Sequence, residues 1–574
     1  MADITNQFNA SVLNNAVFNY GDKKISKYIG VMPVIPEVFI GRDEDIRGVH
    51  DRLFYGNNML LLVNGEGGIG KTTLAAKYFE RYIDDYTHLA WVFAERNLRD
   101  ALLTLAEPLK ITFDQTLSDE ERLEKMLLEM AGLKKPCLLV IDNANDLPDL
   151  TTHYHELRKC PNFHILLTTR ITEFSHARTY RVGHLDEPTA MELFSTHYPG
   201  HNPAEDDLLK GILRAIGYNT LVIELLAKSL RSVNRFRTGY SLEQMLGDLQ
   251  HSGLFGLSRS ETVLMGYNPG SFEFKEEKPE KIIAAMYDLA QLEQGEEQLL
   301  CIFSVLPAEP VAFAALEELQ PGNKELERWL GSLVQKGWIE YDSTTNNFKC
   351  SPVVQAVSRR QVGERLYEQC ELLVDTLVEK LDYDTGTGHW QNTDYKRASL
   401  YVRYAENIIG FIDNTHYEKV ILLDRVGNFH NTIGNLDKAL TFFEERSRLG
   451  KELYEAYPQN VSFKYGLAIS YSKLGSTHSA LGNLDKALTF FEKDTQLTEE
   501  LYEAYPQNVS FKYGLAISYA KLGIFSRDHR NDMEAACSWF AQAEALWAEL
   551  VNRFPAYAEF QKNWAEVKSV LDAL

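Results

Sequence analysis

Residues 60–73 read LLLVNGEGGIGKTT: an apolar run, a glycine-rich turn, and Lys-Thr at the start of an amphipathic helix. The turn matches G-x-x-x-x-G-K-[ST], the pattern of a phosphate-binding P-loop. Glycines let backbone N–H groups converge on phosphate oxygens without Cβ clashes, and the helix N-terminus adds positive partial charge. The stretch therefore predicts nucleotide binding, with Lys71 at the β- and γ-phosphates and the Thr72 hydroxyl on Mg²⁺. The alternative is a strand-to-helix turn without a ligand.

Two further apolar runs end in residues that suit this chemistry. The run CLLVID ends at Asp142, and the run HILLTTR ends at Arg170. In an open α/β sheet, ligands bind at the carboxyl ends of the strands. We therefore expect Asp142 to hold Mg²⁺ together with Thr72, and Arg170 to contact the γ-phosphate. The alternatives are an aspartate that caps a turn and a surface arginine.

The composition restricts the partners and the sites that the chain can have. The chain has 574 residues, and 81 Asp and Glu against 59 Lys and Arg give a net charge of -22. Such a surface repels nucleic acid and anionic lipid. The six cysteines are scattered without a C-x-x-C pair, which indicates reduced thiols, not disulfides or a cysteine zinc site. The sequence shows neither a signal pattern nor a membrane-spanning apolar run, so we expect a cytoplasmic protein.

Residues 1–36 differ from the rest of the chain. They alternate asparagine with apolar residues and carry no charge between Asp3 and Asp22. Such alternation suits strand pairing or cross-β stacking. One interpretation is a signalling segment that templates assembly with a separate effector. The other is a disordered or hairpin-forming tail, followed by a linker at Pro33 and Pro36.

Three patterns divide the next part of the chain. Residues 37–185 alternate apolar strands, expected at 59–63, 88–93, 136–141 and 164–168, with helical stretches, as in a parallel α/β sheet. Residues 186–285 have helical periodicity throughout and predict a helical domain. In residues 286–365, helices precede two short strands, which predicts a winged-helix domain.

Residues 366–574 are repetitive. Gly434–Glu444 recurs as Gly482–Glu492, a period of 48 residues, and Leu453–Gly475 recurs as Leu501–Gly523 with one difference. Each copy places Ala, Leu, Tyr and Phe at helical spacing around a turn. This pattern predicts stacked helix pairs in an α-solenoid of TPR-like repeats. We expect the aromatic stripe to be core and the concave face to bind a protein or peptide.

The order of these motifs resembles the STAND class of P-loop NTPases with an NB-ARC module. A P-loop, Leu-Val-Ile-Asp, Leu-Leu-Thr-Thr-Arg, a helical domain, a winged helix and repeats follow one another here. Plant resistance proteins, apoptosome scaffolds, and bacterial regulators and anti-phage sensors belong to this class. The resemblance covers about 38–365, and the repeats resemble TPR sensors with longer helices. It implies ATP or ADP and Mg²⁺ as ligands.

The resemblance gives the motif residues roles in a nucleotide site. Lys71, Asp142 and Arg170 become the catalytic set, with Asp142 as the Walker B residue and Arg170 as the sensor arginine. Thr72 and Asp142 become the Mg²⁺ ligands. The Walker A segment is implied to surround the phosphates with Gly65, Gly67, Gly68, Ile69, Gly70, Lys71, Thr72 and Thr73.

The stretch VFIGR resembles the segment that packs on adenine just before the nucleotide domain. The resemblance therefore implies cofactor contacts from Val38, Phe39, Gly41 and Arg42.

Three positions depart from the family pattern. The stretch GYNTL has Thr220 before Leu221, where the Gly-x-Pro-Leu element has a proline that rests on adenine. Ser351 replaces the winged-helix histidine that touches the ADP phosphate. Asn143 follows Asp142, where many relatives have an acid that could polarise water, and an amide cannot act as a general base. We therefore expect weaker adenine and phosphate contacts and slow ATP hydrolysis.

These features together predict a signal-transduction switch driven by ATP and ADP. A ligand on the C-terminal repeats would favour exchange of ADP for ATP, and the open form would oligomerise and activate a partner. The resemblance implies bacterial regulation or anti-phage defence. Two alternatives are a transcription regulator of the same class and a TPR scaffold with a largely inactive nucleotide site. We expect no membrane partner and no nucleic acid as the main partner.

Overall fold

The computed structural model describes two compact units. The first unit consists of Met1–Ser304, Ala308–Glu317 and Gly322–Gly363. The second unit consists of Val305–Pro307, Glu318–Pro321 and Glu364–Leu574. The description omits residues 1–16, 21–22, 31, 57–58, 95–96, 115, 173, 175, 236–238, 266–274, 287–291, 385–388, 391–393 and 413–415. Most of the predicted asparagine-rich segment therefore lies outside the described residues. In the part of the chain that is described, no helix is long and apolar enough to cross a membrane.

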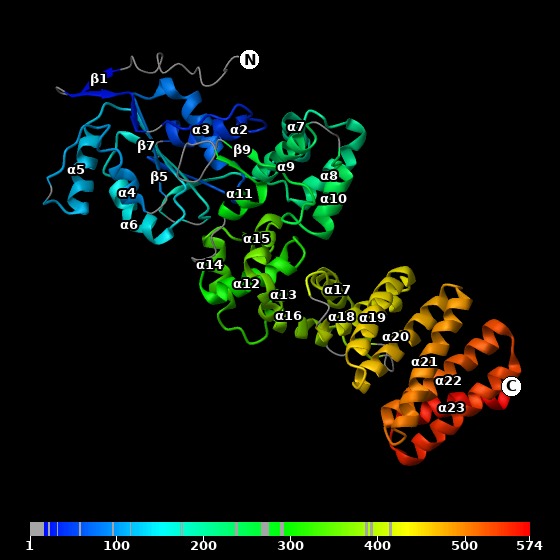
Figure 1. The fold of residues 1–574 in the computed structure, drawn as a ribbon. Coiled ribbons are helices and arrows are strands. Elements are labelled where there is room, and N and C mark those ends of the chain that lie inside the picture. The colour runs from blue at the N-terminus through cyan, green and yellow to red at the C-terminus, as the bar shows by residue number, and fades with distance from the viewer. Residues whose placement is uncertain are drawn as a thin grey trace. The chain divides into compact units, whose positions relative to one another are not determined.

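A parallel six-stranded sheet forms the centre of the first unit (Figure 1). Its strand order places β4, which precedes the P-loop, between β7 and β8, while β6 lies on the other side of β7. The four predicted strands are confirmed to within one residue at each end. In spatial order the strands are β3 (Tyr28–Gly30), β5 (His88–Phe93), β6 (Cys137–Asp142), β7 (Phe163–Thr169), β4 (Leu60–Asn64) and β8 (Arg178–Arg181).

The two outer strands were not predicted from the sequence. β3 lies within the segment assigned to residues 1–36 and pairs in parallel with β5, so the sheet begins before residue 37. It has three residues, and only Ile29 is buried in it. Such a short edge strand is too brief to show an alternating pattern. An antiparallel hairpin of β1 (Val17–Tyr20) and β2 (Lys23–Ser26) precedes it.

Helices cover both faces of the sheet because successive strand residues point to opposite sides. Leu62, Leu139 and Ile165 pack under one helical layer. Leu61 and Leu166 pack under the other. The first layer consists of α4 (Leu98–Leu103), α5 (Asp119–Ala131) and α6 (Leu147–Leu157). The second layer consists of α2 (Asp43–His50), η1 (Asp51–Tyr55) and α3 (Lys71–Arg81). A short turn, η2 (Ile83–Asp85), then leads from α3 to β5.

The next segment is helical, as predicted, apart from one hairpin. β9 (Val263–Met265) pairs antiparallel with β10 (Lys275–Glu277), so the prediction that residues 186–285 are helical throughout is wrong there. Each strand has only three residues, which is too few for a period-two pattern to appear in the sequence. The helices are α7 (Glu187–His197), η3 (Pro203–Glu205), α8 (Asp206–Ala215), α9 (Thr220–Val233), α10 (Leu242–His251) and α11 (Pro279–Met286).

Residues 294–362 have the element order of a winged helix. Three helices alternate with a three-stranded antiparallel sheet of order β11-β13-β12, and a further helix follows. The hairpin of this sheet lies next to the parallel sheet's β8, because Glu340 in β12 pairs with Arg181. The elements are α12 (Gln294–Val305), β11 (Val311–Ala312), α13 (Phe313–Leu319), α14 (Leu326–Gln335), β12 (Glu340–Asp342), β13 (Asn347–Lys349) and α15 (Pro352–Val362), followed by the turn η5 (Gly363–Arg365).

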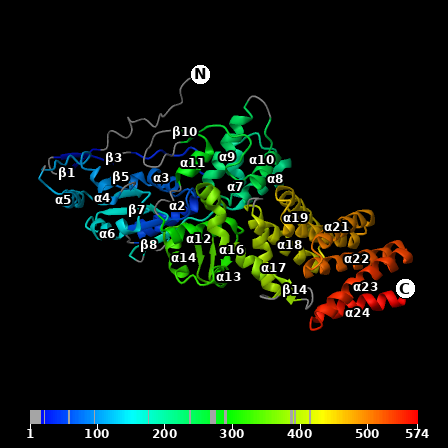
Figure 2. The ribbon, with the colours of Figure 1, turned by 60° about the horizontal axis from the view of Figure 1, so that its bottom comes forward.

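The second unit is a stack of paired helices, consistent with a repeat solenoid (Figure 2). Each predicted copy forms a long helix pair, and consecutive helices pack against each other. The helices are α16 (Leu366–Lys380), α17 (Tyr395–Ile409), α18 (Tyr417–Thr432), α19 (Leu436–Ala456), α20 (Val461–Ala480), α21 (Leu484–Ala504), α22 (Val509–Arg530), α23 (Met533–Arg553) and α24 (Ala558–Ala573), with a small hairpin of β14 (Tyr383–Asp384) and β15 (His389–Trp390).

A glycine–phenylalanine contact recurs along this stack. A Cβ on Gly475 would lie 2.6 Å from the Phe491 ring, and a Cβ on Gly523 would lie 2.9 Å from the Phe540 ring. The glycine lets each ring sit directly on the preceding helix, which explains why the repeat keeps both residues. Phe491 and Phe540 are therefore core residues, as the sequence predicts for the aromatic stripe, whereas Tyr457 and Tyr505 of the same repeats are exposed.

Buried charges distinguish copies that are otherwise nearly identical. Asp424 in α18 forms two ion pairs through its Oδ1 atom. Arg446 Nε lies 2.9 Å from this oxygen, and Lys473 Nζ lies 2.7 Å from it. One repeat later, Lys521 Nζ donates to Ser472 Oγ at 2.9 Å. Ser472 is the residue that differs between the duplicated segments, where the second copy has Ala520. The structure thus explains that difference: the serine provides a hydrogen-bond acceptor for a buried lysine.

Removing the charge of Asp424 should destabilise the helical stack. In Asp424→Asn, Arg446 and Lys473 keep their buried charges without a carboxylate partner, and such a loss costs about 3–5 kcal/mol. The free energy of unfolding can be followed by circular dichroism during urea titration. The control Asp437→Asn changes an exposed aspartate at a helix start and should cost less than about 1 kcal/mol. Equal effects of the two variants would contradict this account.

Candidate functional site

The P-loop connects β4 to α3 and is closed by its own lysine. Lys71 Nζ donates hydrogen bonds of 2.8 Å to the carbonyl oxygens of Gly65 and Glu66. Gly68 has φ 77°, a left-handed conformation that favours glycine. A Cβ at this position would also lie 2.6 Å from Asn219 Oδ1, so the glycine is needed for close approach as well. Lys71, Thr72 and Thr73 form the first turn of α3.

Residues from the helical segment bind the outside of the loop. Asn219 Nδ2 donates to the Gly67 carbonyl at 2.8 Å, and the Leu221 N–H donates to the Gly68 carbonyl at 2.9 Å. Thr220 Oγ1 donates to the Ile69 carbonyl at 3.2 Å. The GYNTL stretch therefore lies against the P-loop, as the resemblance implies, but Thr220 bonds the loop backbone. Asn219 was missed by the sequence reasoning; its signal is an asparagine at the start of a helix, where it also caps α9.

Arg42 also binds the loop. Its Nη2 donates to the Ile69 carbonyl at 3.2 Å and to the Gly183 carbonyl at 2.7 Å, and its Nη1 pairs with Asp45 at 3.1 Å. The side chain is 10% exposed. The hydrogen bonds of Arg42 therefore position the P-loop. The sequence predicted that Arg42 contacts the cofactor and did not predict this role in holding the loop.

The other residues of this stretch assigned to the cofactor are Val38, Phe39 and Gly41. Phe39 packs against the core layer of α2 and α3, and Lys77 Nζ lies 6.0 Å from the centroid of its ring. Val38 is half-buried. Gly41 approaches α7 so closely that a Cβ would lie 2.2 Å from Thr189 Cγ2. Contact of Val38 and Phe39 with a base stays a prediction.

Thr72 and Asp142 are brought together as predicted for a Mg²⁺ site. Thr72 Oγ1 donates to Asp142 Oδ1 at 2.8 Å, and Thr168 Oγ1 donates to the same oxygen. Asp142 is fully buried, and its Oδ2 has no hydrogen-bond partner among the described residues. A buried carboxylate oxygen beside a threonine hydroxyl fits Mg²⁺, which prefers oxygen ligands. The residues present thus suit the expected cofactor.

Burial shifts the ionisation of both charged groups in the site. Burial, together with the nearby positive charge of Arg170, lowers the pKa of Lys71 to about 7, although Asp142 and Glu66 act in the opposite direction. Burial raises the pKa of Asp142, against the effect of the hydrogen bonds from Thr168 and Thr72. A phosphate beside Lys71 and a cation beside Asp142 would each favour the charged form. Both shifts are therefore in the direction that a bound phosphate and a bound cation would reverse.

Asn143 and Arg170 are held in place by Asn145. Asn143 has φ 66°, a conformation that asparagine tolerates, and its N–H donates to Thr168 Oγ1 at 2.9 Å. Asn145 Nδ2 donates to Asn143 Oδ1 at 2.5 Å, while Asn145 Oδ1 accepts from the Arg170 N–H at 2.7 Å. The ends of β6 and β7 are thereby joined next to the P-loop.

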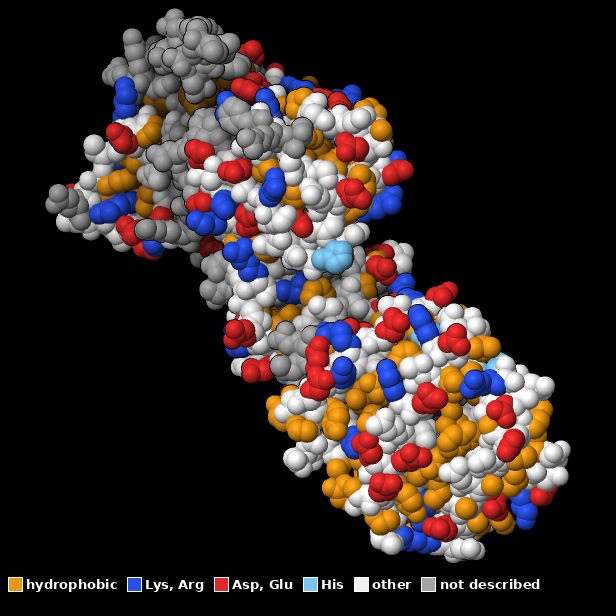
Figure 3. Space-filling view, turned by 45° about the vertical axis from the view of Figure 1, so that its right-hand side comes forward, with side chains coloured by type: hydrophobic (Ala, Val, Ile, Leu, Met, Phe, Trp, Pro, Cys, Tyr) orange, Lys and Arg blue, Asp and Glu red, His pale blue; other side chains and the backbone are white. Residues whose placement is uncertain are grey.

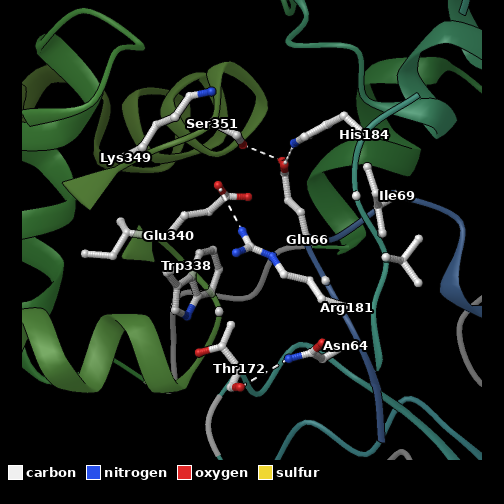
Figure 4. Close-up of a pocket in the computed structure, with 15 residues that line it drawn as sticks. Asn64, Glu66, Ile69, Thr172, Arg181, His184, Trp338, Glu340, Lys349 and Ser351 are labelled. Atoms are coloured by element: carbon white, nitrogen blue, oxygen red, sulfur yellow. Dashed lines mark hydrogen bonds and ion pairs between the residues drawn. The ribbon is translucent and has the colours of Figure 1, made fainter. Parts of the chain in front are cut away.

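A cavity of about 160 Å³ lies beside the P-loop, lined by the sheet and the winged helix (Figure 4). Glu66 points into it and accepts a hydrogen bond from Ser351 Oγ. His184 Nε2 lies 3.3 Å from Glu66 Oε2, and Glu340 pairs with Arg181 at 3.1 Å. Ser351, predicted at a phosphate-contacting position, therefore bonds a P-loop side chain here. The sequence reasoning did not single out Glu66, His184 or Arg181.

Comparisons with known proteins agree with this geometry. The family model for the NB-ARC domain matches residues 42–199. That range contains the P-loop, Asp142 and Arg170 together with most of the parallel sheet. A search of curated proteins found no match to the chain.

Replacing Asp142 should remove the magnesium dependence of nucleotide binding. Asp142→Asn keeps the shape but removes the charge that favours a divalent cation, so ADP affinity with Mg²⁺ should fall at least about tenfold, or 1.4 kcal/mol. Affinity in EDTA should change much less. Titration with fluorescent ADP measures both values.

Asp149→Asn is the matched control. Asp149 Oδ2 accepts from the Leu98 N–H at 2.7 Å, away from the P-loop, and an amide oxygen can still accept there. This variant should keep the wild-type magnesium dependence. A wild-type magnesium dependence in Asp142→Asn would show that Asp142 does not hold the metal.

Proposed function

Because residues 42–199 are an NB-ARC domain, a nucleotide-binding switch module of the STAND class of P-loop NTPases, we propose that this protein is a signalling switch controlled by ATP and ADP. In the proposed ADP-bound form, the nucleotide domain, the helical segment and the winged helix keep the contacts described above. ATP favours a second arrangement that oligomerises. The two nucleotides can select different arrangements only through contacts that differ between them.

The main support for this proposal is the direct contact between the winged helix and the nucleotide site. Ser351 at the start of α15 bonds Glu66 of the P-loop. Thr172, just after β7, donates from Oγ1 to the Val334 carbonyl at 2.7 Å and from its N–H to the Gln335 carbonyl at 3.3 Å. A change at the P-loop or at the end of β7 therefore alters the free energy of winged-helix docking.

Arg170 is the residue best placed to make winged-helix docking depend on the presence of the γ-phosphate. Its guanidinium carbon lies 5.4 Å from the centroid of the Trp338 ring. Gly337 has φ 71°, and a Cβ there would lie 2.1 Å from the Arg170 carbonyl oxygen, so the two backbones are in close contact. A γ-phosphate would compete for the guanidinium through charge-assisted hydrogen bonds. ATP and ADP then differ in how strongly Arg170 stays on Trp338.

We further propose that hydrolysis is slow and resets the switch. Asn143 stands where an acid would polarise water, and its side-chain oxygen accepts a hydrogen bond from Asn145. An amide cannot take up the proton of an attacking water. Lys71, Asp142 and Arg170 would still bind and orient the phosphates, while Mg²⁺, when bound, neutralises developing charge.

The helix stack is the proposed site for the trigger. Paired-helix repeats present extended surfaces to proteins and peptides. Figure 3 shows apolar side chains among acidic and basic ones on the surface of this unit, where Tyr457, Tyr505 and Tyr557 are exposed. Output through residues 1–36 to a separate effector is part of the same proposal. A role in anti-phage defence rests on the resemblance to bacterial members of the class.

The alternatives receive less support from the described residues. A transcription regulator would need a basic wing or recognition helix, whereas the β12–β13 hairpin carries Glu340 and Asp342. A scaffold with an inactive nucleotide site would not need the Thr72–Asp142 pair, which is intact.

The proposal predicts that assembly depends on the nucleotide. Purified protein should retain ADP, identified by chromatography after denaturation, and should be monomeric by light scattering. Mg²⁺–ATP together with a ligand of the repeats should raise the mass to that of an oligomer. A monomer under every nucleotide and trigger condition would exclude the assembly step.

Removing the ring under Arg170 should weaken the ADP-bound form. In Trp338→Leu the site stays apolar but loses its cation–π contact, worth about 0.5–2 kcal/mol. ADP release, measured with a fluorescent analogue, should become about twofold to thirtyfold faster. The matched control is Trp329→Leu, a tryptophan of α14 that packs on Gly295. The same acceleration in the control would show that general loosening of the winged helix, not Arg170, is responsible.

A further inference from the structure

Three potential metal ligands converge in the cavity beside the P-loop. They are Glu66 of the P-loop, His184 after β8, and Glu340 in β12 of the winged helix. Their ligand atoms all lie within 4.8 Å of one another. Figure 4 shows the three side chains pointing into the same space from three separate segments. We call them the Glu66 cluster.

The spacing within the cluster suits a tetrahedral ion. His184 Nε2 and Glu66 Oε2 are 3.3 Å apart. Zinc bonds of 2.0–2.2 Å at tetrahedral angles place neighbouring ligand atoms about 3.3–3.6 Å apart. Glu340 is the residue that has to move closer, and its side chain is 41% exposed, so it has room to do so.

The two carboxylates of the cluster are also oriented from outside, as metal ligands usually are. Glu66 Oε1 accepts from Ser351 and from Asn219 Nδ2 at 3.5 Å. Glu340 Oε2 pairs with Arg181 and, since a carboxylate has two oxygens, can still bind an ion through the other.

Neutral hydrogen-bond donors hold Glu66 inside the cavity, and Lys71 is a nearby positive charge. The Glu66 side chain is 8% exposed, and Ser351 and Asn219, which donate to it, are neutral. Arg181 and Lys349 also line the cavity, but the charge of Arg181 is paired with Glu340.

We propose that the Glu66 cluster binds a zinc-class divalent cation that joins the P-loop to the winged helix. The imidazole nitrogen favours such a metal over Mg²⁺ and Ca²⁺, which prefer oxygen ligands. This site is separate from the Thr72–Asp142 pair and does not depend on the proposed nucleotide switch. The bound ion would stabilise the arrangement in which the winged helix contacts the P-loop, because it binds residues of both.

The test is zinc binding by the full-length protein. The protein is stripped with EDTA and titrated with ZnCl₂ against a chromophoric chelator, with millimolar MgCl₂ present to saturate the magnesium site. Wild type should bind one zinc ion that excess Mg²⁺ does not displace, and its melting temperature should rise. Co²⁺ in place of zinc should give the visible absorption of a tetrahedral site. Absence of stoichiometric zinc binding would overturn the proposal.

Variants separate this site from other zinc-binding groups. His184→Ala and Glu340→Gln should each weaken zinc affinity at least about tenfold, whereas Glu340→His, which restores a ligand atom, should retain binding. The control His201→Ala removes a histidine that lies 3.3 Å from Asp206 and belongs to no three-ligand group among the described residues. It should leave zinc affinity unchanged. Wild-type zinc affinity in Glu340→Gln, or loss in His201→Ala, would contradict the assignment.

Parallel ADP titrations keep the two hypotheses apart. If zinc binds and depends on Glu340 while ADP does not bind, the metal site stands and the nucleotide switch fails. If Mg²⁺–ADP binds and zinc does not, the metal site fails alone.

Discussion

The hydrogen bonds of the P-loop carbonyl groups are the constraint on which the first unit depends. A loop that offers its N–H groups to phosphate directs its carbonyl groups outward, and buried carbonyl groups need donors. Those donors come from Lys71 within the loop, from Arg42, and from residues 219–221 of the helical segment. The shape of the loop is thus maintained jointly by the nucleotide domain and its neighbour, so the two cannot separate without loss of hydrogen bonds.

Two residues then connect the nucleotide domain to the winged helix. Glu66 of the P-loop points into the cavity and bonds Ser351, and Arg170, just after β7, lies on Trp338. One group is a buried carboxylate and the other a cation on an aromatic face, so both contacts respond to added charge. Phosphate near Arg170 and a cation near Glu66 would act in opposite directions on winged-helix docking. The proposed nucleotide and the proposed metal ion would therefore act on the same contacts.

The helix stack shows the same dependence on buried polar groups. Its copies share their aromatic core, but the buried charges between them differ. Asp424 neutralises two cations in one layer, while Ser472 accepts from Lys521 in the next. Buried charges need specific partners, so each helix pair fits its own neighbour better than another copy. Near-identical repeats can in this way keep a defined order.

Local sequence patterns were enough to predict the nucleotide motif, the four central strands and the repeats. These depend on local regularities: glycine spacing, apolar runs and a 48-residue period are visible without knowledge of the fold. Asp142 and Thr72 were also correctly brought together, because strands of a parallel sheet end at one edge. The short edge strand β3 was missed because three residues carry too little pattern.

The contacts of the residues around the P-loop became visible only in the tertiary structure. Arg42 bonds the loop backbone, Asn219 supports the loop from another segment, and Glu66 meets His184 and Ser351. These contacts join residues far apart in the chain, and nothing in local periodicity records which distant donor reaches which carbonyl group. The residues of the P-loop are close together in the sequence and could therefore be predicted from it. Their contacts with neighbouring segments depend on tertiary packing and could not.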